Sequence, residues 1–353
     1  MRHQHLEYLT DPATGQPLTL TIYDQQGPHI ISGLLASPSH RYPIIDGIPR
    51  LTPQSQLKKD AAFNTHQKKT ADSFSYEWNN IYQENEFEKQ NFLHFLGPFI
   101  KACNLKDKKI LDAGCGSGRF AKQAALCGAE VVIATDVGES PRAAYKLTQH
   151  LSNVCIIQAD LYHMPVVNFA DLTFSIGVLH HLPEPQKGFT KLTVTVKPGG
   201  QYLIWVYNRR NNFRAVYVFE SIRKITRHIP KSILYKLCYL PGAAVHSINY
   251  VTHFFNKVGA SRLAKKIPFS YYANFPYRMK LNDAFDVLAT PKSNYYYTEE
   301  IENWFKEARL QNVQTYEHPE AGITAVGSLE QTSDKFEHVS QLHHVSVANN
   351  LRS

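Results

Sequence analysis

The chain has 353 residues, of which 43% are hydrophobic and 19% charged, a composition that predicts a globular protein and excludes a collagen-like or disordered one. Lys and Arg outnumber Asp and Glu by 38 to 30, which permits nucleic acid or an anionic membrane as a partner without establishing either. No run of about 18 apolar residues occurs, so no membrane span is predicted, and no apolar leader follows Met1. Because the five cysteines form no CxxC pair, we expect a cytoplasmic protein with reduced thiols.

The first 107 residues fall into two regimes of composition. Residues 1–55 are rich in Pro, Gly, Thr and Ser and contain the short apolar runs Pro17–Tyr23 and Tyr42–Leu51, which predicts a small β-rich domain. Residues 56–107 are polar and favour helix. We expect this second segment to form a helical linker or lid.

Strand-like and helix-like segments alternate over residues 108–207. The predicted strands are rich in β-branched residues and are bounded by turn signals; they are Lys109–Gly114, Glu130–Asp136, Val154–Asp160, Ala170–Gly177 and Gln201–Tyr207. The predicted helices between them are Gly118–Gly128, Ser140–Leu151 and Pro183–Val196, the last on topology more than on propensity. This alternation predicts an α/β fold, a parallel sheet with helices on both faces.

The alternation stops over residues 208–295 and resumes afterwards. Residues 296–329 carry a predicted helix at Thr298–Leu310 and predicted strands at Asn312–His318 and Gly322–Ser328, which completes the core. Residues 330–353 are polar and are predicted to form a loose tail. The segment 208–295 is therefore an insertion after the fifth strand.

A glycine-rich turn joins the first core strand to the first core helix. It carries Gly114, Gly116 and Gly118 but no Lys-Ser/Thr, so it lacks the phosphate-binding P-loop signature. The third glycine comes one residue too early for the dinucleotide pattern GxGxxG, and Asp112 would repel a pyrophosphate. S-adenosylmethionine has a sulfonium and an ammonium and no phosphate, so the turn favours this ligand.

Two further acids follow strands of the same sheet. Asp136 ends the second strand, where an acid can bind two ribose hydroxyls, and Asp160 ends the third, where it can accept from an adenine amino group beside Leu161. Taken singly, each acid is more readily explained as a helix cap or turn residue. Three acids at three successive strand ends, together with GxGxG, predict a binding site for S-adenosylmethionine.

The motifs between Leu111 and Tyr207 resemble those of the class I methyltransferases. They are, in order, "LDAGCGSGRF", "ATDVGES", "QADLYHMP", "FSIGVLHHLPEP" and "VKPGGQYLIWVY", and the pair "GVLHHL" and "KPGG" is typical of the quinone-biosynthesis methyltransferases. The resemblance implies a Rossmann-like, doubly wound seven-stranded sheet of order 3-2-1-4-5-7-6, with S-adenosylmethionine as cofactor and S-adenosylhomocysteine as product. It implies the following roles: Asp112, Gly114, Gly116 and Gly118 hold the methionine end, Asp136 the ribose and Asp160 the adenine.

The segment "SFSYEW" resembles one that precedes the first strand in bacterial members with a small N-terminal domain. Tyr76 and Trp78 are candidates for a lid over the cofactor, although buried anchors for the helix are the role we favour. The helix at Thr298–Leu310 resembles that of the same subgroup, where a glycine usually precedes the last two strands. Here Arg309 stands near that place.

Residues 6–51 are similar to the small zinc-ribbon domain that accompanies tRNA-modifying methyltransferases or is fused before methyltransferase domains. The likeness rests on "YPIIDGIPRL" and on two turns, "DPAT" and "SPSH", which in the family are CPxC knuckles. At the four ligand positions this chain has Asp11, Thr14, Ser37 and His40, a poor set for zinc. We expect a degenerate ribbon without metal.

The insertion concentrates the positive charge of the chain. Between residues 208 and 295 there are 15 Lys or Arg and 3 acids, a net charge of +12, and many aromatic residues. Its position after the fifth strand predicts a cap over the substrate pocket. Three interpretations stay open: an amphipathic cap with buried aromatics and with Val216, Phe219, Ile222 and Ile225 at helical spacing; a lid for an anionic or lipid-like small molecule; and an RNA groove.

The chemistry of methyl transfer needs alignment and, for a protonated acceptor, a base. His180 and His181, just past the fourth strand, are candidates for the base, although a structural role is favoured. Gly177 before them allows backbone to approach the cofactor. The chain reads "SIGV" where enzymes that methylate exocyclic amines have [ND]PP[YF], so an oxygen or carbon acceptor is favoured.

The sequence therefore predicts an S-adenosylmethionine-dependent methyltransferase that acts on the oxygen or carbon of a small molecule. One alternative is an RNA methyltransferase with the basic insertion as its groove, which makes nucleic acid the second choice of partner. Another is a cofactor-binding partner protein without turnover. No metal is expected.

Overall fold

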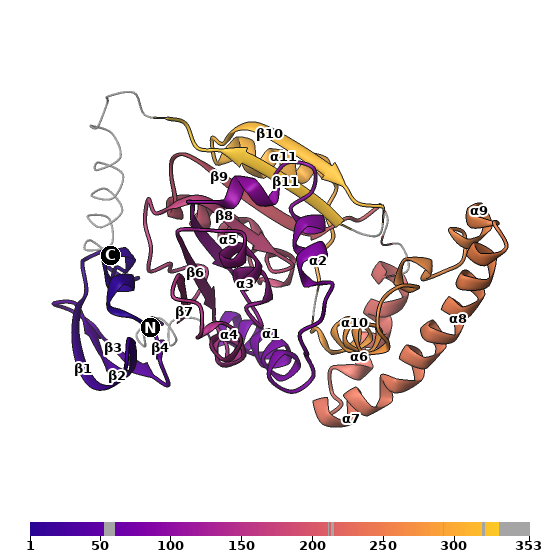
Figure 1. Ribbon diagram of the computed structural model, residues 1–353, viewed down its shortest axis with the longest axis horizontal. Helices are drawn as coiled ribbons and strands as arrows, with labels where there is room; N and C mark the ends of the chain where they lie inside the picture. The colour runs from indigo at the N-terminus through magenta and orange to yellow at the C-terminus, as the bar shows by residue number, and fades with distance from the viewer. Residues whose placement is uncertain (53–60, 211, 213–214, 292, 320–321, 332–353) are drawn as a thin grey trace.

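The computed structural model describes residues 1–52, 61–210, 212, 215–291, 293–319 and 322–331. It contains a small antiparallel sheet at one end, a large sheet covered by helices in the centre and a helical arm at the other end (Figure 1). Most of the predicted tail, residues 332–353, lies outside the described residues. Within the described part of the chain, none of the helices is long and apolar enough to span a bilayer.

The central sheet has seven strands in the order β10-β11-β9-β8-β5-β6-β7, which confirms the predicted order 3-2-1-4-5-7-6. Its strands are β5 Lys109–Ala113, β6 Val131–Asp136, β7 Val154–Gln158, β8 Ala170–Ile176, β9 Val196–Tyr207, β10 Gln311–Glu317 and β11 Gly322–Ser328. Strands β5 to β9 pair in parallel, and β11 runs antiparallel to both β9 and β10. The α/β fold class predicted from the alternation is confirmed.

Helices cover both faces of this sheet and bury its apolar side chains. One face holds α1 Ala61–Asn80, α2 Glu88–Phe95, α3 Arg119–Leu126 and α4 Ser140–Thr148; the other holds α5 Pro185–Leu192 and α11 Thr298–Glu307 (Figure 1). Phe92, Phe120 and Ile110 belong to one core cluster, and Phe189 and Phe305 to the other. Short 3-10 turns precede or link these elements: η1 His3–Tyr8, η2 Ala102–Leu105, η3 Leu179–His181 and η4 Thr193–Thr195.

The helix predicted over Pro183–Val196 is too long. Helix α5 ends at Leu192, and β9 begins at Val196, five residues earlier than predicted. Thr173 of β8 and Thr195 of η4 share a hydrogen bond of 2.8 Å between their hydroxyls, which holds this connection against the sheet. Pairing with β8 therefore overrides the weak local preference of the Thr/Val-rich segment.

The N-terminal residues form a four-stranded antiparallel sheet. Its strands are β1 Thr19–Gln26, β2 His29–Ala36, β3 Arg41–Ile45 and β4 Ile48–Pro49, in that order. The sheet is joined to the edge strand β7: Leu51 donates its N–H to the Gln158 carbonyl at 2.8 Å, and Arg50 bonds the Gln158 side chain at 2.8 Å. It thus covers an edge that would otherwise expose unpaired backbone groups.

The insertion folds into several helices, and three of them pack against the last one, α10. In chain order, the helices and turns are the π-helical turn η5 Ala215–Phe219, α6 Glu220–Thr226, α7 Lys231–Leu237, α8 Tyr239–Lys257, α9 Ser261–Ala264, the turn η6 Ser270–Tyr272 and α10 Tyr277–Ala289. Helices α6, α7 and α8 all contact α10, whose Phe285 is fully buried. A small separate core joins this arm to Ile81 after α1.

Helix α6 does not fit the amphipathic cap, which was one of the three interpretations of the insertion left open. Helical spacing predicts Ile222 and Ile225 on the buried face of an amphipathic helix, yet they are 38% and 71% exposed. The buried residues of α6 are Thr226 and Arg223, the latter 2% exposed. Its guanidinium bonds the Val287 carbonyl, Glu220 and the Ser293 hydroxyl, so a charged network, rather than an apolar stripe, attaches α6 to the rest of the protein.

Candidate functional site

The glycine-rich turn after β5 forces the backbone into left-handed conformations. Gly114, Gly116 and Gly118 have φ of +89°, +53° and +78°. A Cβ on Gly114 would collide with Val178, one on Gly116 would lie 2.7 Å from the Trp78 Nε1, and one on Gly118 would lie 2.8 Å from the Ala144 Cβ. Glycine is therefore needed here both for the conformation and for the close approach of neighbours.

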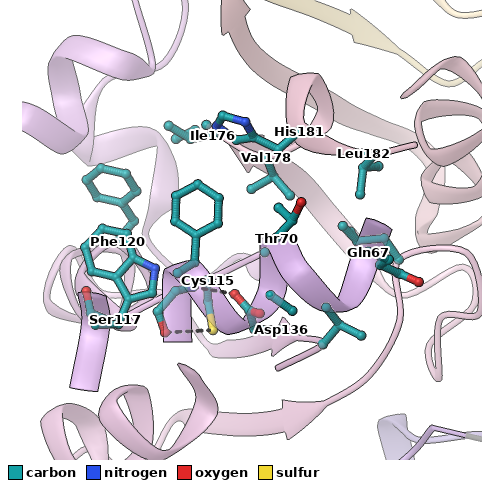
Figure 2. Close-up of a pocket in the computed structure, with 18 of the residues that line it drawn as sticks. Gln67, Thr70, Cys115, Ser117, Phe120, Asp136, Ile176, Val178, His181 and Leu182 are labelled. Carbon is teal, nitrogen blue, oxygen red and sulfur yellow. Dashed lines mark hydrogen bonds between the residues drawn. The ribbon is translucent and has the colours of Figure 1, made fainter. Parts of the chain in front are cut away.

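A pocket opens beside this turn. On one side α1 contributes Gln67, Thr70, Phe74 and Trp78; the other sides are formed by residues 114–117 with Arg119 and Phe120, by Asp136 and Val137, by Leu161, and by residues 176–178 and 181–183. In Figure 2, Gln67 and Thr70 face the same space as Val178 and Leu182. None of these lining residues comes from the insertion at 208–295, so α1, and not the insertion, roofs this pocket.

Several of the predicted cofactor residues meet at this pocket. Gly114, Gly116, Asp136, Leu161 and Gly177 line it. The carboxylate of Asp136 accepts the Gly116 N–H at 2.9 Å and the Gly138 N–H at 3.4 Å. The end of β6 is thereby fixed against the glycine turn of β5.

The other predicted cofactor residues are not among those that line the pocket. Asp112 is 2% exposed, and Gly118 is the N-cap of α3. Asp160 accepts from the Gln67 side chain at 2.9 Å and from the Tyr162 N–H at 3.1 Å. Asp160 therefore attaches α1 to the segment that follows β7, and Gln67, its partner, lines the pocket where Asp160 does not.

The floor of the pocket is electrostatically unusual. Burial, together with the negative charge of Asp136, raises the pKa of Asp112 to about 8. Burial also raises the pKa of Asp136, although the bonds from Gly116 and Gly138 oppose the rise. Among the described residues, the Oδ2 of Asp112 has no hydrogen-bond partner. A buried acid with an unsatisfied oxygen, next to a half-buried acid that lines the pocket, fits a ligand that brings positive charge.

Of the two predicted lid residues, one lines the pocket and the other does not. Trp78 lies against Gly116, with the Arg119 guanidinium 5.4 Å from its ring centroid. Tyr76 instead packs its ring 5.8 Å from Phe285 of α10, so it anchors α1 to the insertion. Sequence reasoning missed Thr70 and Phe74, whose helical spacing with Trp78 on one face of α1 was the available signal.

The two histidines differ in their access to the pocket. His181 lines it, and its Nδ1 lies 3.4 Å from the Ser293 hydroxyl. His180 is fully buried, with its ring 4.0 Å from that of Tyr207, and neither ring nitrogen has a partner within the described ranges. Burial holds the pKa of His180 well below its usual value. Its backbone carbonyl accepts from Asn294, so His180 positions the loop after β8.

Three of the four residues that the sequence resemblance placed at zinc-ligand positions are close together. The buried Asp11 carboxylate accepts bonds from the Ser37 hydroxyl, from the Tyr42 hydroxyl at 2.7 Å and from His40 Nδ1 at 2.9 Å. The Thr14 hydroxyl instead accepts from the Gln16 N–H. Of the residues that the structure describes, no group of three or more His, Cys, Asp or Glu is placed to hold a metal.

Comparison with known proteins assigns the central part of the chain. Residues 111–204 match the model of a family described as a methyltransferase domain. The ubiquinone biosynthesis O-methyltransferase of Pseudomonas syringae pv. tomato is 33% identical over 136 residues, which are 36% of this chain and 57% of that protein. The tRNA U34 carboxymethyltransferase of Ruthia magnifica is 29% identical over 133 residues, 36% of this chain and 41% of that protein.

The sequence matches cover only part of each of these two kinds of relative. The chain spans little more than half of the length, 57%, of the ubiquinone-biosynthesis relatives. A solved S-adenosylmethionine-dependent methyltransferase from Aquifex aeolicus is 15% identical, with a TM-score of 0.41 over 72% of this chain and 98% of its own. The strand order, the glycine turn and the family match together define a class I S-adenosylmethionine-dependent methyltransferase domain.

Proposed function

We propose that the whole protein binds S-adenosylmethionine in the pocket under α1 and transfers its methyl group to the oxygen or carbon of a small molecule. The observation that carries this proposal is the glycine turn with its three left-handed residues, two of which line the pocket beside the half-buried Asp136 and above the buried Asp112. Such a site suits a cationic ligand without phosphate. When bound, this cofactor supplies a methyl group that its sulfonium has already activated.

We assign the cofactor contacts as follows. Gly114 and Gly116 lie against the methionine end, and Asp112 compensates its positive charge through the carboxylate beneath the turn. Asp136 accepts from the ribose hydroxyls with the oxygens that now accept from Gly116 and Gly138. Leu161 lies against the adenine, and Trp78 forms part of the roof of the site. Asp160 acts through Gln67, to which it is bonded.

His181 is the candidate for a base. Of the two adjacent histidines, His181 is the one that lines the pocket. Its Nδ1 shares a hydrogen bond with the hydroxyl of Ser293, which belongs to the insertion. The name of the ubiquinone-biosynthesis relative supports an oxygen acceptor. Because the insertion contributes this hydrogen bond, it adjusts the acceptor side of the site without lining the cofactor pocket.

A methyl-transfer assay tests the proposal and its rival together. Purified protein is incubated with methyl-labelled S-adenosylmethionine and a fractionated host extract, and the label is counted in small molecules and lipids, in RNA and in protein. We expect label in the first fraction, and less of it with Asp136→Ala at the same concentration of cofactor. Label in RNA would instead favour the basic insertion as a groove, and cofactor binding without label in any fraction would favour a partner protein without turnover.

We also propose that the N-terminal sheet is a ribbon-like module held together without metal. The hydrogen bonds that converge on Asp11 support this, since they join the two turns that a zinc ion would otherwise join. Atomic absorption after dialysis should find far less than one zinc per chain. One zinc per chain, lost in His40→Ala, would overturn this assignment.

A further inference from the structure

The long helix of the insertion presents its apolar face to solvent. Leu240, Val251, Phe254 and Val258 are 74%, 49%, 61% and 57% exposed. Successive members are 11, 3 and 4 residues apart, a spacing that places them in one stripe on one side of the helix. Leu240, Val251 and Phe254 lie in α8, and Val258 directly follows it. Ala244 and Ser247, both exposed, continue the stripe between them. For a helix in a globular protein this arrangement is inverted, because the apolar stripe normally faces the core.

The opposite face of α8 is small and polar, and it is the face that is buried. Gly242, Asn249 and Thr252 are its buried residues. A Cβ on Gly242 would lie 3.6 Å from the Leu281 Cα of α10, so the two helices are in close contact there. The Tyr277 hydroxyl bonds the Tyr239 carbonyl at 3.1 Å. These contacts fix the rotation of α8 and keep its apolar stripe outward.

The stripe lies in a strongly basic part of the chain. Residues 221–282 contain 11 Lys or Arg and no Asp or Glu. Exposed cations stand at both ends of α8: Lys236 precedes it, Lys257 is its last residue, and Arg262, Lys265 and Lys266 follow. The next acid, Asp283, is bonded to the Tyr272 hydroxyl.

The stripe also lies at the periphery of the molecule. In Figure 1, α8 and α9 form the outer edge of the arm, and α10 and α6 stand between them and the central sheet. A large flat partner can therefore reach α8 without displacing the core or the pocket. Of the arm's described residues, none lines that pocket.

We infer that α8, with α7 and α9, is a peripheral membrane-binding surface that lies on a bilayer carrying anionic headgroups. The apolar stripe enters the boundary of the acyl chains, while the cations at both ends of the helix contact the headgroup phosphates. Charge complementarity favours this occupant over a second copy of the chain, because pairing two such arms would bring two acid-free basic surfaces together. This inference is independent of the proposed methyl transfer.

The test is co-sedimentation of the full chain with vesicles of phosphatidylcholine alone or mixed with phosphatidylglycerol. We expect binding to the mixed vesicles, weakened by salt, and little binding to phosphatidylcholine. The double variant Leu240→Gln/Phe254→Gln should bind the mixed vesicles at least about tenfold more weakly. The matched control is Leu126→Gln, whose side chain is 59% exposed at the end of α3. It should bind as the wild type does.

Two results would overturn the inference. One is wild-type protein that stays in the supernatant with phosphatidylglycerol vesicles; the other is a double variant that binds them as tightly as the wild type. Thermal melting and cofactor affinity separate loss of the surface from loss of the fold, since both should be unchanged in the double variant. If sedimentation velocity shows a dimer that the same two substitutions abolish, the stripe belongs to a second copy and the lipid assignment is wrong.

Discussion

Gly116 is the residue at which conformation and contact can be separated by experiment. Its φ is +53°, and a Cβ there would lie 2.7 Å from the Trp78 Nε1. Gly27, in the turn between β1 and β2, has nearly the same φ, +56°, with nothing within 4 Å of the position that a Cβ would take. Gly116→Ala and Gly27→Ala should each lose about 1–2 kcal/mol of stability from the left-handed backbone. Only Gly116→Ala should also lose cofactor affinity, by at least about tenfold, because Trp78 must move.

The comparison uses thermal melting for stability and calorimetry for S-adenosylmethionine affinity. If both variants bind the cofactor as the wild type does, the glycine turn is not part of the binding site. If both lose affinity equally, the loss reports general destabilisation. The pair therefore distinguishes a local effect on the pocket from a global one.

Asp112 makes cofactor binding depend on pH. Its pKa of about 8 in the folded protein lies above the usual value for Asp of about 3.9, so the ligand-free protein loses stability as pH rises between these values. A cationic ligand stabilises the ionised carboxylate. S-adenosylmethionine should therefore bind more tightly as pH rises from about 6 to 8, with release of a proton. Calorimetry in buffers of different ionisation enthalpy measures that release.

The control for this prediction is Asp112→Asn. It keeps the size of the side chain and removes the titration, so the affinity should be lower at pH 8 and should change little with pH. A variant with the pH dependence of the wild type would assign the proton to another group, of which Asp136 is the nearest candidate.

For single residues, the sequence predicted the glycines and the acids of the site but not which of them line the pocket. Gly114, Gly116 and Asp136 line the pocket, as a strand-end argument led us to expect. Asp160 does not, because Gln67 of α1 takes its carboxylate. That contact joins residues 93 apart in the chain, and no local pattern encodes it.

Among the elements, the end of α11 offers a clear stability prediction. Arg309 follows this helix with a φ of +58°, a left-handed position that glycine normally fills. The resemblance to related methyltransferases placed a glycine near this point. Arg309→Gly should raise the free energy of unfolding by about 0.5–1 kcal/mol, since it removes the steric cost of the side chain. Chemical denaturation measures the change.

The contrasting variant is Lys306→Gly, within α11, which should lower the free energy of unfolding by about 1 kcal/mol. Both substitutions replace one exposed cation by glycine in the same helix region, so charge and composition are matched. A destabilised Arg309→Gly would mean that the arginine side chain makes a compensating interaction.

The helices of the insertion show where periodicity fails as a predictor. Val216, Phe219, Ile222 and Ile225 have helical spacing, yet Ile222 and Ile225 are exposed, and α6 is attached through Arg223. Spacing indicates that one face of a helix is apolar. It does not indicate whether that face turns toward the core or away from it.

For the whole molecule, the alternation of strands and helices was sufficient to predict the sheet, since the rules for parallel connections leave few arrangements. The docking of the small sheet on β7 and the placement of α1 over the pocket depend on contacts between distant segments, such as Leu51 with Gln158 and Gln67 with Asp160. These contacts arise only once the sheet has brought the strand ends together. The position of α1 over the pocket was therefore less predictable from the sequence than the strand ends on which the pocket is built.

The central claim is that the pocket between α1 and the strand ends binds S-adenosylmethionine. The most direct measurement is titration calorimetry of the purified chain with this cofactor, for the wild type and Asp136→Ala. We predict one site per chain in the wild type and a loss of about 1–3 kcal/mol in the variant, because the hydrogen bonds to the ribose are removed. No heat of binding in the wild type, or equal affinity in both proteins, would contradict the account.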